Sequence, residues 1–219
     1  MTRIMHVSDT HGKFPPLNGD YSIVVHSGDF FPDFHGKRPN AAQGEHYDWL
    51  VSKTLVMKQW LKGHPFLFCL GNHDALNADM MENFLNSEGI KAINLHDRIS
   101  SFDNINFYGF PYVPAINGNY NYEALEKEMT EQVDRMVEAI NKTYTDVIVA
   151  HAPIYGTLDE YHGRHIGNVS MANALDYKIE KDMMPHVFMC GHLHETCAIT
   201  MRGELLVSNM ATSQCIIEV

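Results

Sequence analysis

The sequence predicts a layered α/β protein whose parallel strands end at one edge. In the first half of the chain, short apolar runs alternate with longer amphipathic segments, which is the pattern of βα units. The last quarter consists mainly of short apolar runs separated by turn residues, which indicate added antiparallel strands. Five of the apolar runs are followed directly by acidic, amide or histidine residues, at the strand end where such folds bind ligands.

The expected strands are rich in Val, Ile and Phe and are bounded by turn residues, as buried strands are. They cover residues 3–8, 21–27, 66–70, 90–95, 105–109, 146–150, 186–190, 196–201, 204–208 and 214–218. Three longer connections are predicted to be loops, at 30–44, 111–120 and 155–169. The first of these loops follows a polar cluster directly, so it should lie over the proposed site.

Four segments are predicted to be helices, at 45–62, 77–88, 121–141 and 170–181. Apolar residues at three- and four-residue spacing indicate which face of a helix packs on a sheet. In the first helix the expected stripe is Trp49, Leu50, Leu55, Val56, Met57, Trp60 and Leu61. In the third helix it is Leu125, Met129, Val133, Met136, Val137 and Ile140.

Five short polar clusters follow the apolar runs RIMHVS, YSIVVHS, PFLFCL, DVIVA and HVFMC. The clusters are Asp9-Thr10-His11, Gly28-Asp29, Gly71-Asn72-His73-Asp74, His151 and Gly191-His192-Leu193-His194. Because the carboxyl ends of parallel strands meet at one edge, we expect one site assembled from most of the chain. For the same reason we expect a single domain over residues 1–219.

The residue types in these clusters suit divalent metal ions. Carboxylate and imidazole ligands without thiolate favour Mn, Fe, Co, Ni or Zn. The candidate ligands are Asp9, His11, Asp29, Asn72, His151, His192 and His194. With one bridging carboxylate, these side chains suffice for two ions, and two ions about 3.5–4 Å apart can hold both the attacking and the leaving oxygen of an in-line displacement.

His73 lies beside a candidate ligand but is not needed as one, so it is the candidate proton donor to a leaving group or hydrogen-bond donor to a phosphoryl oxygen. Asp74 is expected to hold the His73 ring from behind, as carboxylates near metal sites do. Taken alone, each cluster also has a structural explanation: His151 as a buried histidine, Asp29 as a turn acid, Asn72 to Asp74 as a turn that leads into a helix cap. That explanation needs five coincidences in one order at one edge, so we favour the shared site.

The order of the clusters resembles the pattern of the calcineurin-like metallophosphoesterase family, D-x-H, G-D, G-N-H-D/E, a lone H and G-H-x-H, with no position missing. The resemblance implies a four-layer αββα sandwich with two mixed β-sheets and a site of two metals. The implied ligands of the first ion are Asp9, His11 and His194. Those of the second ion are Asn72, His151 and His192. Asp29 would bridge the ions, and His73 matches the family's catalytic histidine.

A second resemblance involves the segments FYGFPYVPAINGN (107–119), AHAPIYGTLD, GHLHE and SNMATS. They look like the vertebrate metallophosphoesterase-domain-containing proteins and their microbial relatives, which are associated with cyclic-nucleotide phosphodiesterase activity. Some vertebrate members lack a histidine of the last motif. Both His192 and His194 are present in this chain, which favours an active enzyme.

Residues in the loops around the site are candidate substrate contacts. An arginine near the metals could bind a phosphate through two hydrogen bonds, and an aromatic ring could stack on a base. The candidates are Asn72, His35, Arg38, Tyr112, Asn117, Tyr120, His162, Arg164 and His165. For each of them the alternative is an ordinary exposed loop residue.

Composition restricts partners and location. The formal net charge of −11, from 16 basic and 27 acidic residues, argues against a nuclease or an anionic-membrane binder. No stretch approaches the roughly 18 apolar residues of a spanning helix, and MTRIMHVSDTHG lacks the apolar region of a signal peptide. The cysteines show no C-x-x-C spacing, which suits a reducing compartment. We expect a cytoplasmic protein; its oligomeric state is open.

These observations predict a dinuclear-metal phosphodiesterase that hydrolyses a small phosphodiester, such as a cyclic nucleotide, by in-line attack of a metal-bound hydroxide with His73 as the acid. Mn is the metal expected to support activity in vitro. A phosphomonoesterase or a nucleotide pyrophosphatase is the alternative on the same centre. A non-catalytic scaffold of the same fold is a third possibility, and the intact ligand set and His73 argue against it.

Overall fold

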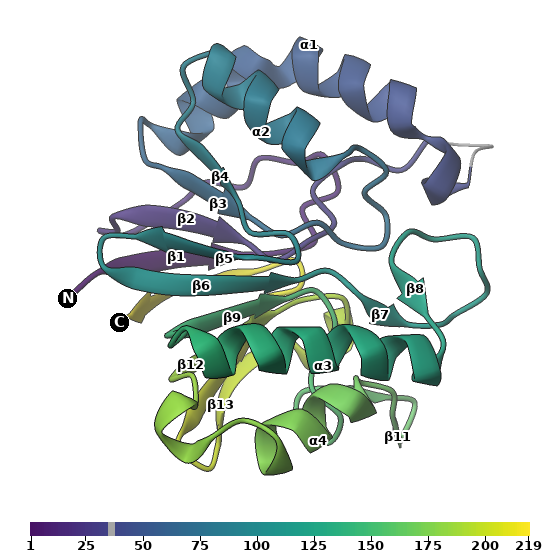
Figure 1. Cartoon of the computed structure of the whole chain (residues 1–219). Helices are drawn as coiled ribbons and strands as arrows, with labels where there is room; N and C mark the ends of the chain where they lie inside the picture. The colour runs from purple at the N-terminus through teal and green to yellow at the C-terminus, as the bar shows by residue number, and fades with distance from the viewer. Residues whose placement is uncertain (35–37) are drawn as a thin grey trace.

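A computed structural model describes residues 1–34 and 38–219 of the chain. It has four layers (Figure 1). The helices α1 (Gln43–Leu61) and α2 (Ala78–Ser87) cover one sheet, and α3 (Glu126–Lys142) and α4 (Val169–Tyr177) cover the other. The two sheets pack against each other in the middle, so the fold is the αββα sandwich with mixed sheets that the family resemblance implied.

The first sheet has the order β15-β1-β2-β3-β4. Its strands are β1 (Arg3–Val7), β2 (Ile23–His26), β3 (Phe66–Phe68), β4 (Ala92–Asn94) and β15 (Gln214–Glu218). The strands β1 to β4 are parallel to one another, and β15 pairs antiparallel with β1. The carboxyl ends of β1, β2 and β3 therefore lie side by side.

The second sheet has the order β13-β14-β12-β9-β6-β5. Its strands are β5 (Ile99–Phe102), β6 (Ile105–Phe110), β9 (Val147–Ala150), β12 (Val187–Cys190), β13 (Ala198–Arg202) and β14 (Leu205–Asn209). The four central strands are parallel, and both edge strands pair antiparallel. The carboxyl ends of β9 and β12 are neighbours here, like those of β1 to β3 in the first sheet.

Short elements complete the connections. Two small ribbons pair β7 (Val113–Pro114) with β8 (Glu123–Ala124), and β10 (Glu160–Tyr161) with β11 (Arg164–His165). Three single-turn helices are η1 (Pro39–Ala41), η2 (Lys181–Met183) and η3 (His194–Thr196). None of the helices in the described chain combines the length and the apolar character needed to cross a membrane.

Three hydrophobic clusters fill the spaces between the four layers. In β1, Ile4 packs between the sheets, whereas Met5 and Val7 pack against the helices. In β12, Phe188 faces the helix layer and Met189 faces the other sheet. Because both faces of these strands are buried, they consist of nearly continuous apolar residues instead of alternating polar and apolar ones.

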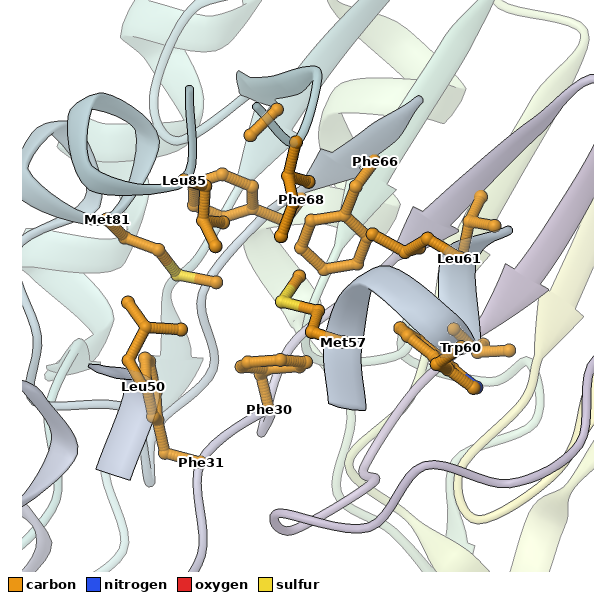
Figure 2. Close-up of a cluster of buried hydrophobic side chains, with 14 of the residues drawn as sticks. Phe30, Phe31, Leu50, Met57, Trp60, Leu61, Phe66, Phe68, Met81 and Leu85 are labelled. Carbon is orange, nitrogen blue, oxygen red and sulfur yellow. The ribbon is translucent and has the colours of Figure 1, made fainter. Parts of the chain in front are cut away.

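The cluster under α1 and α2 contains two phenylalanines that directly follow a predicted metal ligand. Phe30 and Phe31 insert among Leu50, Met57 and Phe66 (Figure 2). Burying a side chain of this size stabilises the fold by about 1.5–3 kcal/mol, so the backbone next to Asp29 is firmly held.

The stripe predicted for α1 is correct in part. Leu50, Met57, Trp60 and Leu61 are buried and Trp49 is partly buried, but Leu55 and Val56 are exposed. A step of 100° per residue places residue 54 on the buried face, and Thr54 lies there, its hydroxyl donating to the carbonyl of Leu50. Counting apolar residues assigned two of them to the wrong face.

Other boundaries also differ from the sequence expectations. The helix expected from 121 begins at Glu126, because residues 123–124 form β8 and Leu125 is an exposed N-cap. The strand β5 was not predicted, since its two serines and edge position give it a weak apolar pattern. The predicted loops 111–120 and 155–169 contain β7 and the β10–β11 ribbon.

Two fully buried histidines stabilise the strand ends next to the site. The His6 ring lies 2.9 Å from the hydroxyls of both Ser27 and Ser208, and so links the two sheets. His26 Nε2 lies 3.0 Å from the Thr10 hydroxyl. Burial lowers the pKa of each histidine to about 3, so both are neutral in the folded protein.

The buried His6 makes folding dependent on pH. Because its pKa is depressed on folding, its contribution to stability is complete above pH 6.5 and is lost as the pH falls toward 3. For each additional proton that the unfolded state binds, the free energy of unfolding changes by about 1.4 kcal/mol per pH unit. In urea unfolding of metal-free protein between pH 6.5 and 4, His6→Gln should show a shallower loss of stability than wild type. Equal slopes would contradict this.

Candidate metal centre

The five predicted clusters converge where the two sheets meet. The Asp9 N–H donates to the carbonyl of Gly28, and the Gly191 N–H donates to the carbonyl of His151, so the clusters are paired within each sheet. Ser8, after β1, and Ala211, after β14, form a parallel bridge between the sheets. All seven candidate ligands lie on the connections that leave β1, β2, β3, β9 and β12.

Several of these ligands have an uncommon backbone conformation. The φ angles are +52° at Asp9, +43° at His11, +55° at Asp29 and +70° at His192. Such left-handed conformations are unfavourable for residues with a Cβ, and they persist where surrounding contacts hold them, often at functional sites. The tight turns let the chain reverse direction at once, so that ligands from both sheets point into one volume.

The glycines before the ligands are required by close packing. A Cβ on Gly71 would lie 2.3 Å from Asp29 Oδ1 and 2.4 Å from the Asp29 nitrogen. A Cβ on Gly191 would lie 2.1 Å from Asp9 Oδ2. These distances are below any tolerable contact, so only glycine lets the Asn72 and His192 loops approach the two carboxylates.

The first group of donors surrounds Asp9. Its carboxylate accepts the His192 N–H at 2.9 Å, and its Oδ1 lies 3.4 Å from His194 Nε2. The ligand atoms of Asp9, His11 and His194 all lie within 4.8 Å of one another. The hydrogen bond to Asp9 raises the pKa of His194, so a positive charge, whether proton or metal ion, is favoured here.

Asp29 lies between this group and a second one. Its Oδ1 accepts the His73 N–H at 2.9 Å and lies 3.3 Å from His151 Nε2. Its Oδ2 lies 3.8 Å from His11 Nε2. The two oxygens of one carboxylate thus face histidines of different strands.

The second group requires a cation on electrostatic grounds. His151 Nδ1 lies 3.0 Å from the Ser27 carbonyl and must carry its hydrogen there. In the neutral ring Nε2 then has a lone pair, and it faces Asn72 Oδ1 at 2.9 Å as well as the Asp29 carboxylate. Three acceptors cannot converge in a buried site without a proton or a metal ion among them.

The pKa values show the same demand for positive charge. Burial lowers the pKa of His151, but the Asp29 carboxylate outweighs it and raises that pKa to about 9. Burial raises the pKa of Asp29, but His151 and its neighbours bring it well below the ordinary value. Burial and the charge of His151 lower the pKa of His192 to about 4, which leaves a neutral ring able to bind a metal. The donor set therefore fits divalent metal ions.

His73 lies at the edge of this centre. Its Nδ1 is 2.6 Å from Asp33 Oδ1, and its Nε2 is 3.9 Å from Asp29 Oδ2. Asp33 therefore orients the ring, and Nε2 is directed toward the donors. Asp33 was not among the candidate residues, although it is the acid in the loop 30–44 that was expected to cover the site.

The structure differs from expectation at Asp74. Its carboxylate accepts the backbone N–H groups of Phe30, Phe31 and Gly71, at 2.8–3.2 Å, and the carboxylate at the His73 ring is Asp33. Asp74 follows His73 on a turn, and its side chain points inward to satisfy buried N–H groups. Asp74 thus fixes the loops that carry Asp29 and Asn72.

His46 also supports the site, and nothing in the sequence indicated this. Its Nδ1 accepts the Ala75 N–H at 3.0 Å, its Nε2 lies 3.3 Å from the Pro32 carbonyl, and its ring stacks on Phe31. Burial lowers its pKa to about 4, so it is a neutral brace between the loops after Asp29 and His73.

A cleft of about 440 Å³ opens over the metal-ligand side chains. Its walls include Ile116 and Tyr120 from the loop after β7, and Tyr161 and Ile166 from the segment after β9. The remaining lining residues are His11, Asp29, Asp33, Asn72, His73, His192, Leu193, His194 and Glu195. The predicted loops do reach the site.

Most individual substrate contacts expected from these loops lie elsewhere. Tyr112 directs its hydroxyl to Asp97, and His165 Nδ1 binds Asp159 at 2.6 Å. Among the described residues, the lining of this cleft includes Asn72 and Tyr120 but not Arg38, Tyr112, Asn117, His162, Arg164 or His165. The candidate His35 lies outside the described residues.

The αββα sandwich gathers Asp and His side chains that could hold a metal ion at its strand ends, and together with a match to a family profile this identifies a metal-dependent phosphoesterase. The sequence profile of the Calcineurin-like phosphoesterase family matches residues 2–196, and the chain belongs to this family. No curated protein matches the chain.

Solved structures share the fold at low sequence identity. The protein TT1561 of Thermus thermophilus is 12% identical with a TM-score of 0.61, over 96% of this chain and 89% of that one. A "Putative 5'-Nucleotidase from Staphylococcus aureus" in complex with alpha-ketoglutarate is 12% identical with a TM-score of 0.53. That match covers 94% of this chain but only 48% of the other, so this chain spans about half its length. These likenesses show the fold alone.

Replacing Gly71 by alanine tests the close packing of the centre. The added Cβ would overlap Asp29, so Gly71→Ala should lose bound metal and at least about 1–3 kcal/mol of stability. Elemental analysis and thermal unfolding measure the two effects. Gly44→Ala is the matched control, because nothing lies within 4 Å of its added Cβ in α1. Unchanged metal content and stability in Gly71→Ala would contradict the packing argument.

Proposed function

We propose that the chain is a dinuclear-metal phosphodiesterase that hydrolyses a small phosphodiester, with cyclic nucleotides among its candidate substrates. The observation that carries this proposal is the position of Asp29. One of its oxygens faces His151 and the other faces His11 and His73, as a carboxylate shared between two ions requires.

The proposed ligand sets are those that the family resemblance implies, and the first of them coincides with a group of donors in the structure. Asp9, His11 and His194 would hold the first ion together with Asp29. Asn72, His151 and His192 would hold the second, also with Asp29. The ligand atoms of Asp9, Asp29 and His151 lie within 4.8 Å of one another, which supports adjacent ions. The ions, when bound, polarise the phosphoryl group and supply a nucleophilic oxygen at neutral pH.

The protein's own residues then handle the proton and the orientation. His73 Nδ1 is held by Asp33, so Nε2 is the nitrogen that can donate a proton to the leaving alkoxide. Asp74 and His46 keep the loops around His73 and Asp29 in place through backbone contacts. These contacts give a preorganised donor next to the phosphoryl site.

The charge of the cleft favours a substrate of low negative charge. Of the described residues that line it, none is a lysine or an arginine, and Asp33 and Glu195 add negative charge. A phosphodiester carries one negative charge, whereas nucleic acids and triphosphates carry many, so we favour a small diester over a polyanion. A phosphomonoesterase or nucleotidase is the second candidate, and it is compatible with the shared fold of a protein described as a putative 5'-nucleotidase.

The metal and the compartment are further parts of the proposal. Oxygen and imidazole donors suit Mn, Fe, Zn, Ni or Co, and we propose Mn for assays in vitro. The four cysteines are free thiols, which supports a reducing compartment such as the cytoplasm.

His73→Ala tests the role of the proton donor. With Mn-loaded protein, turnover of bis-p-nitrophenyl phosphate, p-nitrophenyl phosphate and a panel of cyclic nucleotides should show which ester class is hydrolysed. The variant should lower kcat on the best substrate about 10²–10⁴-fold while keeping two ions per chain. His64→Ala is the control, because His64 is partly exposed and its ring contacts the Ser22 carbonyl and no candidate ligand. Loss of metal in His73→Ala would mean that His73 is a ligand.

Asp29→Asn tests the bridge. Removing the charge between the two groups of donors should weaken both ions, so metal content should fall from two toward zero and turnover should be lost. Elemental analysis with isothermal titration of Mn measures this. A variant that keeps one ion at wild-type affinity would contradict a shared carboxylate.

A further inference from the structure

The cleft beside the metal-ligand side chains has two apolar edges. Ile116 is 52% exposed, Ile166 42% and Tyr161 40%, although all three face the same cleft. Tyr120 lies at the inner end, with its ring centroid 4.8 Å from that of His73. Apolar side chains that line a cleft beside candidate metal ligands offer a surface on which an apolar part of a ligand can pack.

The edge that carries Ile116 and Tyr120 is tied to the ligand loop. Glu123 Oε1 accepts the N–H groups of Ile116 at 2.7 Å and Asn117 at 2.9 Å. The Asn121 N–H donates to the Asn72 carbonyl at 2.9 Å. This edge therefore has a set position relative to the metal ligands.

The edge that carries Tyr161 and Ile166 is tied by Asp159, which is almost fully buried. Asp159 Oδ2 accepts the N–H groups of Gly156 and Gly167, and its Oδ1 binds His165. The Thr196 hydroxyl donates to the Leu158 carbonyl at 2.7 Å, which fastens the segment to the turn after His194. The loop is thus closed on itself and docked at the metal-ligand residues.

Each tethered loop contributes one apolar edge to the cleft of about 440 Å³, which lies between the metal ligands and two tyrosines. This lining suits an aromatic group of a ligand. An aromatic ring can enter such a space with room to spare, contact isoleucine side chains and stack on tyrosine without needing a charged partner. A second phosphate would meet Asp33 and Glu195, and the described lining offers it no lysine or arginine.

We propose, building on the phosphodiesterase function above, that the cleft selects phosphodiesters carrying an aromatic or heteroaromatic ester group. The group is held by Ile116, Tyr120, Tyr161 and Ile166 while the phosphoryl oxygens lie at the metal centre. Asp159 and Glu123 act as positioning residues for the two edges.

The test uses two anions that carry the same single charge and cannot be hydrolysed, diphenylphosphinate and dimethylphosphinate. Titration calorimetry on Mn-loaded wild-type protein should show the diphenyl compound binding at least about tenfold more tightly, as burial of aromatic surface implies. Tyr161→Ala and Ile166→Ala should each reduce this ratio at least about threefold, and the double variant should bring it near one. Equal affinity in wild type, or an unchanged ratio in the double variant, would overturn the proposal.

Controls separate this preference from misfolding and from the catalytic proposal. Tyr177→Ala and Ile199→Ala remove comparable side chains that are 83% and 48% exposed outside the cleft, and both should keep the wild-type ratio. The wild-type protein is also assayed with bis-p-nitrophenyl phosphate. Turnover with a ratio of one refutes the aromatic preference alone, whereas a high ratio without turnover of any ester refutes the proposed hydrolysis and supports the binding site.

Discussion

The carboxylate of Asp29 is buried at the junction of two sheets, surrounded by histidines from three different loops. A buried charge is costly unless opposite charge and hydrogen bonds compensate it. The compensation comes from the backbone N–H of His73 and from the side chains of His11, His73 and His151. Much of the surrounding structure can be understood as the means of holding this one charged group in place.

Several features serve that purpose from the outside. Phe30 and Phe31, the two residues after Asp29, are buried in the core under α1 and α2. The Asp74 carboxylate accepts their backbone N–H groups. Gly71 lets a neighbouring loop touch the carboxylate. A residue far from the cleft in sequence can therefore affect metal binding by shifting a loop, even when it contacts no ligand. The positive φ angle of Asp29 is tolerated because these contacts hold it.

The positions of most strands along the chain and the ligand clusters were predictable because both depend on local patterns. A short apolar run with a polar cluster at its end predicts a buried strand and its exit loop, and five such units predict a shared edge. Helix faces were less predictable: Leu55 is apolar but exposed, and Thr54 is buried. Whether a helix residue is buried depends on its angular position around the helix axis. The number of apolar residues in the segment does not give that position.

Residue type and spacing were enough to identify the family, the candidate ligands and His73 as the candidate proton donor. The reason is that metal coordination restricts which side chains can occur at those positions. Chain folding alone determines that Asp33 instead of Asp74 meets the His73 ring, that His46 braces two loops, and that Ile116, Tyr120, Tyr161 and Ile166 form the cleft edges. Each of these contacts joins segments distant in sequence. Their geometry depends on how loops from two sheets pack together, which no local pattern encodes.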